Sequence, residues 1–382
     1  MKIGINALSI IPNNIGGGEV YLVNLIENMA QLDTTNSFYL FISKFNRGLF
    51  NISKKNFFKV KCNLPNNHFF PRIVYEQTML PYLTNKLQLD VLHSPANYLP
   101  LFNNKRNILT IQHLINYYHP KFFPLWKRAI YNPLVKRSAL KANIVIANSD
   151  STNSQITKRI GVPAENIRTI YHGKSPIFKP IEKEIVEKQL KKFFSISDDY
   201  ILMISTKNPQ KNPIEIIRAF AYLKLKYKKP LKLVQVGLKS SVHERMFDEI
   251  EKHKLSAEIF SLGYISHDKM PVLYNGAQAL LFPSIGEDFG LPLVEAMACG
   301  CPVITSNIYA PPEIVGDAGL IVDPYNNREI AEAIYSILEN PELREVLIRR
   351  GLERANAFSW ETTAKKTLDI YEEVFRKSVI KS

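Results

Sequence analysis

Short apolar runs alternate along the chain with longer segments in which apolar residues recur at helical spacing. The runs predict strands at 2–7, 38–42, 91–94, 107–111 and 144–147, and again at 200–205, 231–237, 259–262, 279–283 and 302–305. Strands that alternate with helices are typical of parallel sheets, because a parallel connection needs a crossover. The pattern therefore predicts the α/β class, with two facing Rossmann-like domains that each have a mostly parallel sheet flanked by helices.

A polar and charged segment separates the two sets of predicted strands. Residues 178–188 read FKPIEKEIVEK, which is typical of an exposed linker followed by a helix. A chain of 382 residues is long enough for two domains of ordinary size, each with its own core. Ligands of doubly wound domains bind at the carboxyl ends of the strands, so we expect the functional residues there.

Residues 284–304, SIGEDFGLPLVEAMACGCPVI, contain the start of a predicted helix. We expect that helix to begin near Gly290, because Pro292 suits the first turn. The backbone N–H groups of Phe289, Gly290 and Leu291 would then lie at its N-terminus. Such N–H groups and the helix dipole favour a phosphate, so we expect these three residues to bind a diphosphate.

Glu287 and Glu295 stand eight positions apart around this helix start. Glu287 would overhang the phosphate, and Glu295 would accept sugar hydroxyls further along the helix. Their spacing, with PS and FGLP around the first and EAMA and PVI around and after the second, resembles the E-x7-E signature of the family 4 retaining glycosyltransferases. The resemblance implies that Glu287 contacts the transferred sugar and that Glu295 binds the nucleotide ribose. Acidic residues also occur near helix N-termini for dipole reasons alone.

A run of three glycines, with Gly17 and Gly18 as its second and third members, follows the first predicted strand. Consecutive glycines allow a ligand to approach the backbone closely. Glu19 follows the three glycines. The segment resembles the Gly-Gly-x-Glu loop of the same family, which closes on the donor phosphates and borders the acceptor. We therefore expect Gly17 and Gly18 to contact the donor, with a plain flexible turn as the alternative.

Lys211 lies in a loop between a predicted strand and a predicted helix at 214–227. We expect Asn212 to cap that helix, with Pro213 at its first position. Lys211 would then lie beside a helix start, where its ammonium group can pair with a diphosphate oxygen.

The family usually places an arginine five positions before this lysine or immediately before it. Here Thr206 and Gln210 occupy those positions, so the second cation is in doubt. We expect Lys207 to replace it at the donor, and a solvated lysine is the alternative.

The segment TIQHL at 110–114 resembles the T-I-H-D-L turn of the family. Gln112 stands where the family has its histidine, and His113 stands where it has its aspartate. Either His113 or Gln112 would hydrogen-bond to the transferred sugar, and we favour His113. We expect His93 and His172, which also lie at strand ends, to be structural hydrogen-bonding residues.

The resemblance extends over both halves of the chain and implies the GT-B fold. It implies an acceptor-side domain at 1–178, joined by a C-terminal helix at 361–382, and a nucleotide-sugar-binding domain at 179–360. It also implies transfer of a sugar from a nucleotide-diphosphate donor with retention at the anomeric carbon. No Asp-x-Asp motif stands near a strand end, so we expect no metal and no cofactor, with Lys211 and the helix N-terminus neutralising the leaving diphosphate.

Other functions share this architecture. A nucleotide-sugar epimerase would need no acceptor, and a glycan phosphorylase would need a cofactor lysine that we do not identify. A non-catalytic, membrane-associated homologue would typically lack Glu287 or Lys211, and both are present. The sequence does not decide between UDP, GDP and ADP, because base contacts would come largely from backbone near Tyr264, which we include among the donor-binding residues.

The net charge of +14 is concentrated in the first half of the chain. Residues 1–180 hold 22 Lys and Arg against 7 Asp and Glu, whereas the remainder holds 27 against 28. No acidic residue stands between Asp90 and Asp150. The basic residues in that interval are Lys105, Arg106, Lys121, Lys127, Arg128, Lys136, Arg137 and Lys141, and the aromatic residues among them are Tyr117, Tyr118, Phe122, Phe123, Trp126 and Tyr131.

A basic surface with aromatic side chains is typical of proteins that bind anionic lipid headgroups. We therefore expect the first domain to contact an anionic membrane while it acts on a glycan or lipid-linked acceptor of the cell envelope. Solubilising charge explains the same pattern equally well. Nucleic acid is not expected as a partner, because no recognition motif is present.

The remaining composition gives no sign of a membrane span or of a disulfide framework. No run of 18 apolar residues occurs, and the first residues read as a buried strand rather than a signal peptide, so we expect a cytoplasmic protein. Three cysteines, Cys62, Cys299 and Cys301, are too few for a framework and are expected to pack in the interior.

Overall fold

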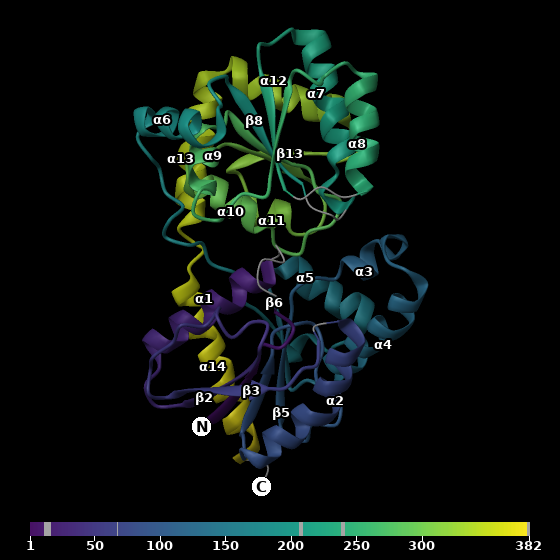
Figure 1. The fold of residues 1–382 in the computed structure, drawn as a ribbon, viewed down its shortest axis with the longest axis vertical. Helices are drawn as coiled ribbons and strands as arrows, with labels where there is room; N and C mark the ends of the chain where they lie inside the picture. The colour runs from purple at the N-terminus through teal and green to yellow at the C-terminus, as the bar shows by residue number, and fades with distance from the viewer. Residues whose placement is uncertain (11–16, 67, 206–208, 238–240, 380–382) are drawn as a thin grey trace. The chain divides into compact units, whose positions relative to one another are not determined.

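The computed structural model describes residues 1–10, 17–66, 68–205, 209–237 and 241–379. The chain divides into two compact units, the first formed by 1–173 with 359–382 and the second by 174–358 (Figure 1). The sequence predicts these breaks after residues 178 and 360. Each unit is a sheet flanked by helices, which confirms the predicted α/β class with two parallel-sheet domains.

The first unit is built on a seven-stranded sheet in the order β3-β2-β1-β4-β5-β6-β7, in which neighbouring strands run parallel. Its strands are β1 (Lys2–Asn6), β2 (Ser37–Ser43), β3 (Phe57–Cys62), β4 (Val91–Ser94), β5 (Arg106–Ile111), β6 (Ile144–Ala147) and β7 (Ile167–Thr169). Its α-helices are α1 (Gly17–Leu32), α2 (Phe69–Lys86), α3 (Ile115–Tyr118), α4 (Leu125–Lys141), α5 (Asp150–Gln155) and α14 (Trp360–Val379). Short turns of other helical types are η1 (Pro120–Phe122), η2 (Ile156–Ile160) and η3 (Ala164–Asn166).

The second unit is built on a six-stranded sheet in the order β10-β9-β8-β11-β12-β13, again with parallel neighbours. Its strands are β8 (Tyr200–Ile204), β9 (Lys232–Val236), β10 (Ile259–Gly263), β11 (Ala279–Phe282), β12 (Val303–Ser306) and β13 (Gly319–Val322). Its helices are α6 (Lys183–Phe194), η4 (Pro209–Lys211), α7 (Pro213–Tyr227), α8 (Ser241–Lys252), α9 (Met270–Gly276), α10 (Leu291–Ala298), α11 (Pro311–Val315), α12 (Asn327–Glu339) and α13 (Pro341–Ala355).

Three strands of the structure are absent from the sequence prediction, namely β3, β7 and β13. β3 pairs only with β2, so it lies at an edge of its sheet, and its lysines Lys59 and Lys61 are exposed and interrupt the apolar run. β7 is three residues long and also lies at an edge. Edge strands bury less apolar surface than central ones, so their sequence pattern is weaker.

The last helix, α14, belongs to the first unit and packs against α1. Its Tyr371 hydroxyl contacts His93 Nδ1 at 2.7 Å, and His93 Nε2 contacts Thr110 Oγ1 at 2.7 Å. Burial lowers the pKa of His93 to about 3, so the ring is neutral. His172 is likewise buried, with a pKa of about 3, and stacks on Trp360 with ring centroids 5.6 Å apart. Both histidines are therefore structural.

The strand order of each sheet reverses at one place. In the second unit the reversal falls between β8 and β11, which are adjacent although β9 and β10 lie between them in the chain. In the first unit it falls between β1 and β4. Loops at the carboxyl ends of such strand pairs border the ligand sites of open α/β sheets. The loops that carry Lys211 and Glu287 follow β8 and β11.

Candidate functional site

The helix that follows β11 has Gly290 as its N-cap residue. Gly290 has φ +95°, a left-handed conformation, and an added Cβ would lie 3.0 Å from Leu293 Cδ1. A residue with a side chain is therefore strained here, which explains the glycine. α10 runs from Leu291 to Ala298 with Pro292 in its first turn, so the predicted start is right, and the helix ends two residues before Gly300. The N–H of Leu291 lies in the first turn, where helix geometry provides no intrahelical partner.

The Glu287 carboxylate forms an ion pair with the ammonium group of Lys211. The two side chains retain only 10% and 11% of their surface exposed, so both charges are largely removed from solvent. Lys211 Nζ also lies 4.2 Å from the ring centroid of Phe282, at the end of β11. The Glu287 backbone is held by the N–H of Ala310, which donates to its carbonyl at 3.2 Å. The structure therefore brings together two residues that the sequence singles out separately.

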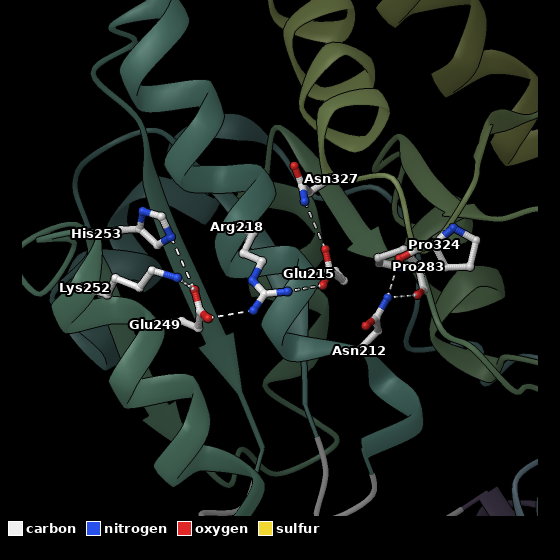
Figure 2. A network of polar contacts seen from close by, with 9 residues as sticks. All are labelled: Asn212, Glu215, Arg218, Glu249, Lys252, His253, Pro283, Pro324 and Asn327. Carbon is white, nitrogen blue, oxygen red and sulfur yellow. Dashed lines mark hydrogen bonds and ion pairs between the residues drawn. The ribbon is translucent and has the colours of Figure 1, made fainter.

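Asn212 holds the Lys211 loop against the ends of two strands, as Figure 2 shows. Its amide Nδ2 donates to the carbonyl oxygens of Pro283 at 3.2 Å and Pro324 at 2.6 Å. Asn212 is the N-cap residue of α7, with Pro213 next, but its side chain makes no capping hydrogen bond, so the predicted side-chain cap is wrong. The side chain instead satisfies two carbonyl groups beyond β11 and β13. The same loop is held by Ile285 N–H, which donates to the Gln210 carbonyl at 2.8 Å.

A chain of ion pairs fixes the helix that begins at this loop. Arg218 of α7 pairs with Glu215 and with Glu249 of α8, both at 2.7 Å, and Asn327 donates to Glu215 at 3.1 Å (Figure 2). The hydrogen bond from Arg218 lowers the pKa of Glu249 to about 2. α7 is thus tied to α8 and α12, so the Lys211 loop extends from a fixed helix.

Glu295 accepts from two protein side chains. The Tyr274 hydroxyl donates to Oε2 at 2.9 Å, and His267 Nε2 lies 3.3 Å from Oε1. The hydrogen bond to Glu295 raises the pKa of His267, so the histidine readily carries the positive charge of this pair. A carboxylate oxygen can accept more than one hydrogen bond, so each oxygen of Glu295 can also accept a hydrogen bond from a ligand hydroxyl. Glu295 itself is buried, at 8% exposure.

The other predicted donor residues of the second unit lie in different surroundings. Tyr264 is exposed and follows Gly263, whose φ is +68°, in the loop after β10. Phe289 is buried, with its ring edge-on to Phe358 at 5.6 Å. Lys207 lies outside the described residues.

In the first unit, α1 begins at Gly17, directly after the six residues that the structure does not describe. A Cβ added at Gly18 would come no closer than 3.8 Å to Ile10 Cδ1, which is an ordinary contact. Packing among the described residues therefore does not require glycine at position 18. A ligand that approached the backbone closely would require it.

His113 is held in one tautomer by Asn97. Asn97 Oδ1 accepts the N–H of Gln112 at 2.6 Å, which identifies the other amide atom as the nitrogen. That nitrogen lies 2.8 Å from His113 Nδ1, so Nδ1 accepts and Nε2 carries the proton. Desolvation by the surrounding protein atoms and the charge of Lys127 lower the pKa of His113, although the residue is exposed in part. A neutral His113 with an Nε2–H group is a hydrogen-bond donor.

Gln112 keeps the alternative role open. Among the described residues, its side-chain Nε2 is buried and has no hydrogen-bond partner. Its carbonyl accepts from Asn148 at 3.1 Å, so its backbone is fixed while its amide nitrogen remains able to donate.

The sequence prediction misses His267 and Tyr274, which hold Glu295, and Asn97, which holds His113. His267 follows β10 by four residues, so its place at a strand carboxyl end was the available signal. Tyr274 lies on α9 and is fully buried, and no sequence pattern distinguishes it from an ordinary core tyrosine.

Across the residues that the structure describes, no three His, Cys, Asp or Glu side chains gather in a way that could hold a metal ion. No helix in the same ranges is long and apolar enough to span a membrane.

The chain resembles known proteins along almost its whole length. The family described as "Glycosyltransferase Family 4" matches residues 15–175, and the family described as "Glycosyl transferases group 1" matches 186–354. An "O-antigen chain mannosyltransferase B" of Escherichia coli is 30% identical over 282 residues, which cover 74% of each chain.

Solved structures share the fold. Sucrose-phosphate synthase from Thermosynechococcus elongatus has a TM-score of 0.83 at 20% identity, over 99% of this chain and 100% of that one. HepE of Anabaena, solved in complex with UDP-glucose, has a TM-score of 0.77 at 16% identity, over 98% of this chain and 100% of that one. The family matches and the mannosyltransferase relative together show that the chain belongs to glycosyltransferase family 4.

Proposed function

We propose that this glycosyltransferase moves a hexose from a nucleotide-diphosphate sugar to a glycan or lipid-linked acceptor, with retention at the anomeric carbon and without a metal ion. The pathway we propose is the synthesis of a cell-envelope polysaccharide or lipopolysaccharide. The observation that carries the proposal is the ion pair of Lys211 with Glu287 at the point where the strand order reverses. The O-antigen mannosyltransferase relative supports mannose as the first sugar to test.

In this proposal the leaving diphosphate binds between Lys211 and the start of α10. An ammonium group has three N–H donors, so Lys211 can keep Glu287 and still donate to a phosphate oxygen. The first-turn N–H of Leu291 and the positive end of the helix dipole act on the same charge. Stabilising a leaving group with fixed donors of this kind needs no reorganisation as charge develops.

The sugar and the ribose are assigned to the two glutamates. Glu287 accepts hydroxyls of the transferred sugar next to the phosphate, and Glu295 accepts the ribose hydroxyls with the oxygen capacity that Tyr274 and His267 leave. The UDP-glucose bound to HepE supports a nucleotide sugar as the donor class. In the first unit, Gly17 and Gly18 would border the donor and His113 would donate from Nε2 to a sugar oxygen.

The acceptor proposal rests on charge. Residues 1–180 hold 22 Lys and Arg against 7 Asp and Glu. Such a surface favours contact with an anionic membrane on which a lipid-linked acceptor resides. We place the protein on the cytoplasmic side of that membrane as a peripheral protein.

Nucleotide sugars with UDP, GDP and ADP carriers, incubated with the protein, test the proposal. A thermal shift with one carrier selects the nucleotide, and transfer to a lipid-linked acceptor is then followed by mass spectrometry. The configuration of the new linkage, read from the one-bond C1–H1 coupling, should match that of the donor sugar.

Three results would contradict parts of the proposal. Release of an epimerised nucleotide sugar without an acceptor would indicate an epimerase. An inverted linkage would reject retention, and a loss of transfer on adding EDTA would reject metal independence. Glu258→Ala, at the amino end of β10, serves as the control variant that should transfer normally.

A further inference from the structure

α2 and α4 are neighbouring helices of the first unit (Figure 1). Both carry exposed apolar side chains. We call Phe70 and Val74 of α2 with Trp126 and Ile130 of α4 the α2–α4 apolar face. Their exposed fractions are 47%, 60%, 50% and 43%. In each helix the two residues are four positions apart and so lie on the same side. The rings of Phe70 and Trp126, 5.4 Å apart, join the two helices into one surface.

The same outer side of α4 continues into positive charge. Arg137 follows Ile130 by seven positions, which returns it to the same side of the helix, and it is exposed. The neighbouring Lys136 is exposed as well. No acidic residue stands between Asp90 and Asp150, so α4 offers no carboxylate to offset these groups.

α2 contributes apolar surface without exposed negative charge. The only carboxylate in the helix is Glu76, which is buried at 1% exposure and accepts from Asn6 Nδ2 at 3.3 Å. An exposed apolar surface with a positive edge and no exposed acid complements an anionic bilayer, in which apolar side chains insert and basic ones meet headgroups. A second copy of this chain would bring like charges together, which disfavours it as the occupant.

We propose that the α2–α4 apolar face is the surface by which the protein inserts into an anionic lipid bilayer. The inference rests on the membrane contact proposed above and locates it on two helices rather than on the basic segment as a whole. Trp126 and Phe70 enter the headgroup region together, and Arg137 stays at the phosphate level. Phe123, by contrast, is only partly exposed, and its ring lies 5.0 Å below Lys127 Nζ.

The two tryptophans of the chain make this contact directly measurable. Trp126 is half exposed, whereas Trp360 is buried at 4% exposure. Vesicles of phosphatidylglycerol and phosphatidylcholine added to the whole protein should shift tryptophan emission to shorter wavelength and reduce quenching by acrylamide. The shift should disappear in Trp126→Phe, which keeps an aromatic side chain and should still co-sediment with the vesicles. Pure phosphatidylcholine vesicles should produce neither effect.

The double variant Phe70→Ser/Trp126→Ser should bind these vesicles about tenfold more weakly, because binding scales with the apolar area inserted. Leu225→Ser is the matched control, since Leu225 is 81% exposed on α7 of the second unit. Arg137→Glu should also weaken vesicle binding, and this effect should be larger at low salt than at high salt. Circular dichroism establishes that each variant is folded.

Co-sedimentation of the wild type without any change in Trp126 emission would overturn the inference, as would binding unchanged in the double variant. A dimer in solution that the double variant dissociates would assign the face to a second copy instead. Nucleotide affinity is measured without vesicles and does not depend on lipid binding. A failure of the lipid experiment can therefore be distinguished from a failure of the proposed donor site.

Discussion

Lys211 and Glu287 form an ion pair although 76 positions separate them in the chain. Each follows a strand next to the reversal of strand order, so the sheet topology brings a cation and a carboxylate to one place. Both side chains are largely buried. Side chains that packing and an ion pair hold in one position lose less conformational entropy when a ligand binds.

Lys211→Ala should lower kcat/KM by about 10²-fold or more, the size of effect seen when one preorganised donor to a developing anion is removed. Lys207→Ala should lower kcat/KM less, because Lys211 holds the family position and forms the ion pair with Glu287. Steady-state kinetics of the two variants with a saturating acceptor measure the order. A larger loss in Lys207→Ala would show that Lys207 is the main phosphate cation.

A double-mutant cycle isolates the Lys211–Glu287 pair itself. Lys211→Met and Glu287→Gln should each reduce the free energy of unfolding, and the two losses together should exceed the loss in the double variant by a coupling of about 0.5–3 kcal/mol. The reason is that either single change leaves the other charge buried without its partner. Urea unfolding of the four proteins gives the coupling, and a value near zero would mean that solvent already screens the pair.

Asn212 is predicted to act as a positioning residue for Lys211. Asn212→Asp should reduce stability and raise KM for the donor more than Asn212→Gly does. Both variants lose the donors to Pro283 and Pro324, worth about 1–3 kcal/mol, but only the aspartate directs a charge at two carbonyl oxygens. Glycine also suits the φ of +57° at this position.

Asn327→Ala is the control for this comparison, because Asn327 donates to Glu215 of α7 rather than to the carbonyl groups that Asn212 binds. It should reduce stability and leave KM for the donor unchanged. If all three variants changed KM in proportion to their loss of stability, Asn212 would have only a structural role.

Glu295→Ala should weaken nucleotide binding by about 1.5–3 kcal/mol, the range for hydrogen bonds to a charged group. Titration calorimetry on the folded variant is the measurement. Glu258→Ala is the matched control, because Glu258 lies at the amino end of β10 and pairs with Lys224 at 3.0 Å. Unchanged affinity in Glu295→Ala would remove Glu295 from the ribose site.

The sequence predicts the nine central strands because buried parallel strands read as apolar runs, and it also predicts the edge strand β10. It predicts the start of α10 because glycine and proline mark the helix start. It also identifies Glu287 and Lys211, because the motif around each residue is a short continuous segment of the chain. It does not predict that they pair, nor that Asn212 bonds to Pro283 and Pro324, because these contacts depend on which strands become neighbours. The contact of Tyr274 with Glu295 is missed for the same reason, since it depends on the packing of α9 on α10. His267 reaches Glu295 from the loop after β10.

The His267–Glu295 contact predicts a pH dependence with a definite sign. Glu295 raises the pKa of His267 above its ordinary value of 6.5, so the folded protein binds this proton more tightly than the unfolded chain does. The stabilisation is therefore fully present below about pH 6.5 and is lost as the pH rises through the raised pKa. The difference in unfolding free energy between the wild type and His267→Gln should follow that course.

Histidine NMR titration measures the same linkage directly. His267 should titrate above 6.5 in the wild type and move back toward that value in Glu295→Gln, which keeps the shape of the side chain and removes its charge. His93 and His172, with pKa values of about 3, should show no titration between pH 5 and pH 8 and so serve as internal controls. A His267 that titrates at or below 6.5 in the wild type would show that the 3.3 Å contact with Glu295 does not hold a charged histidine.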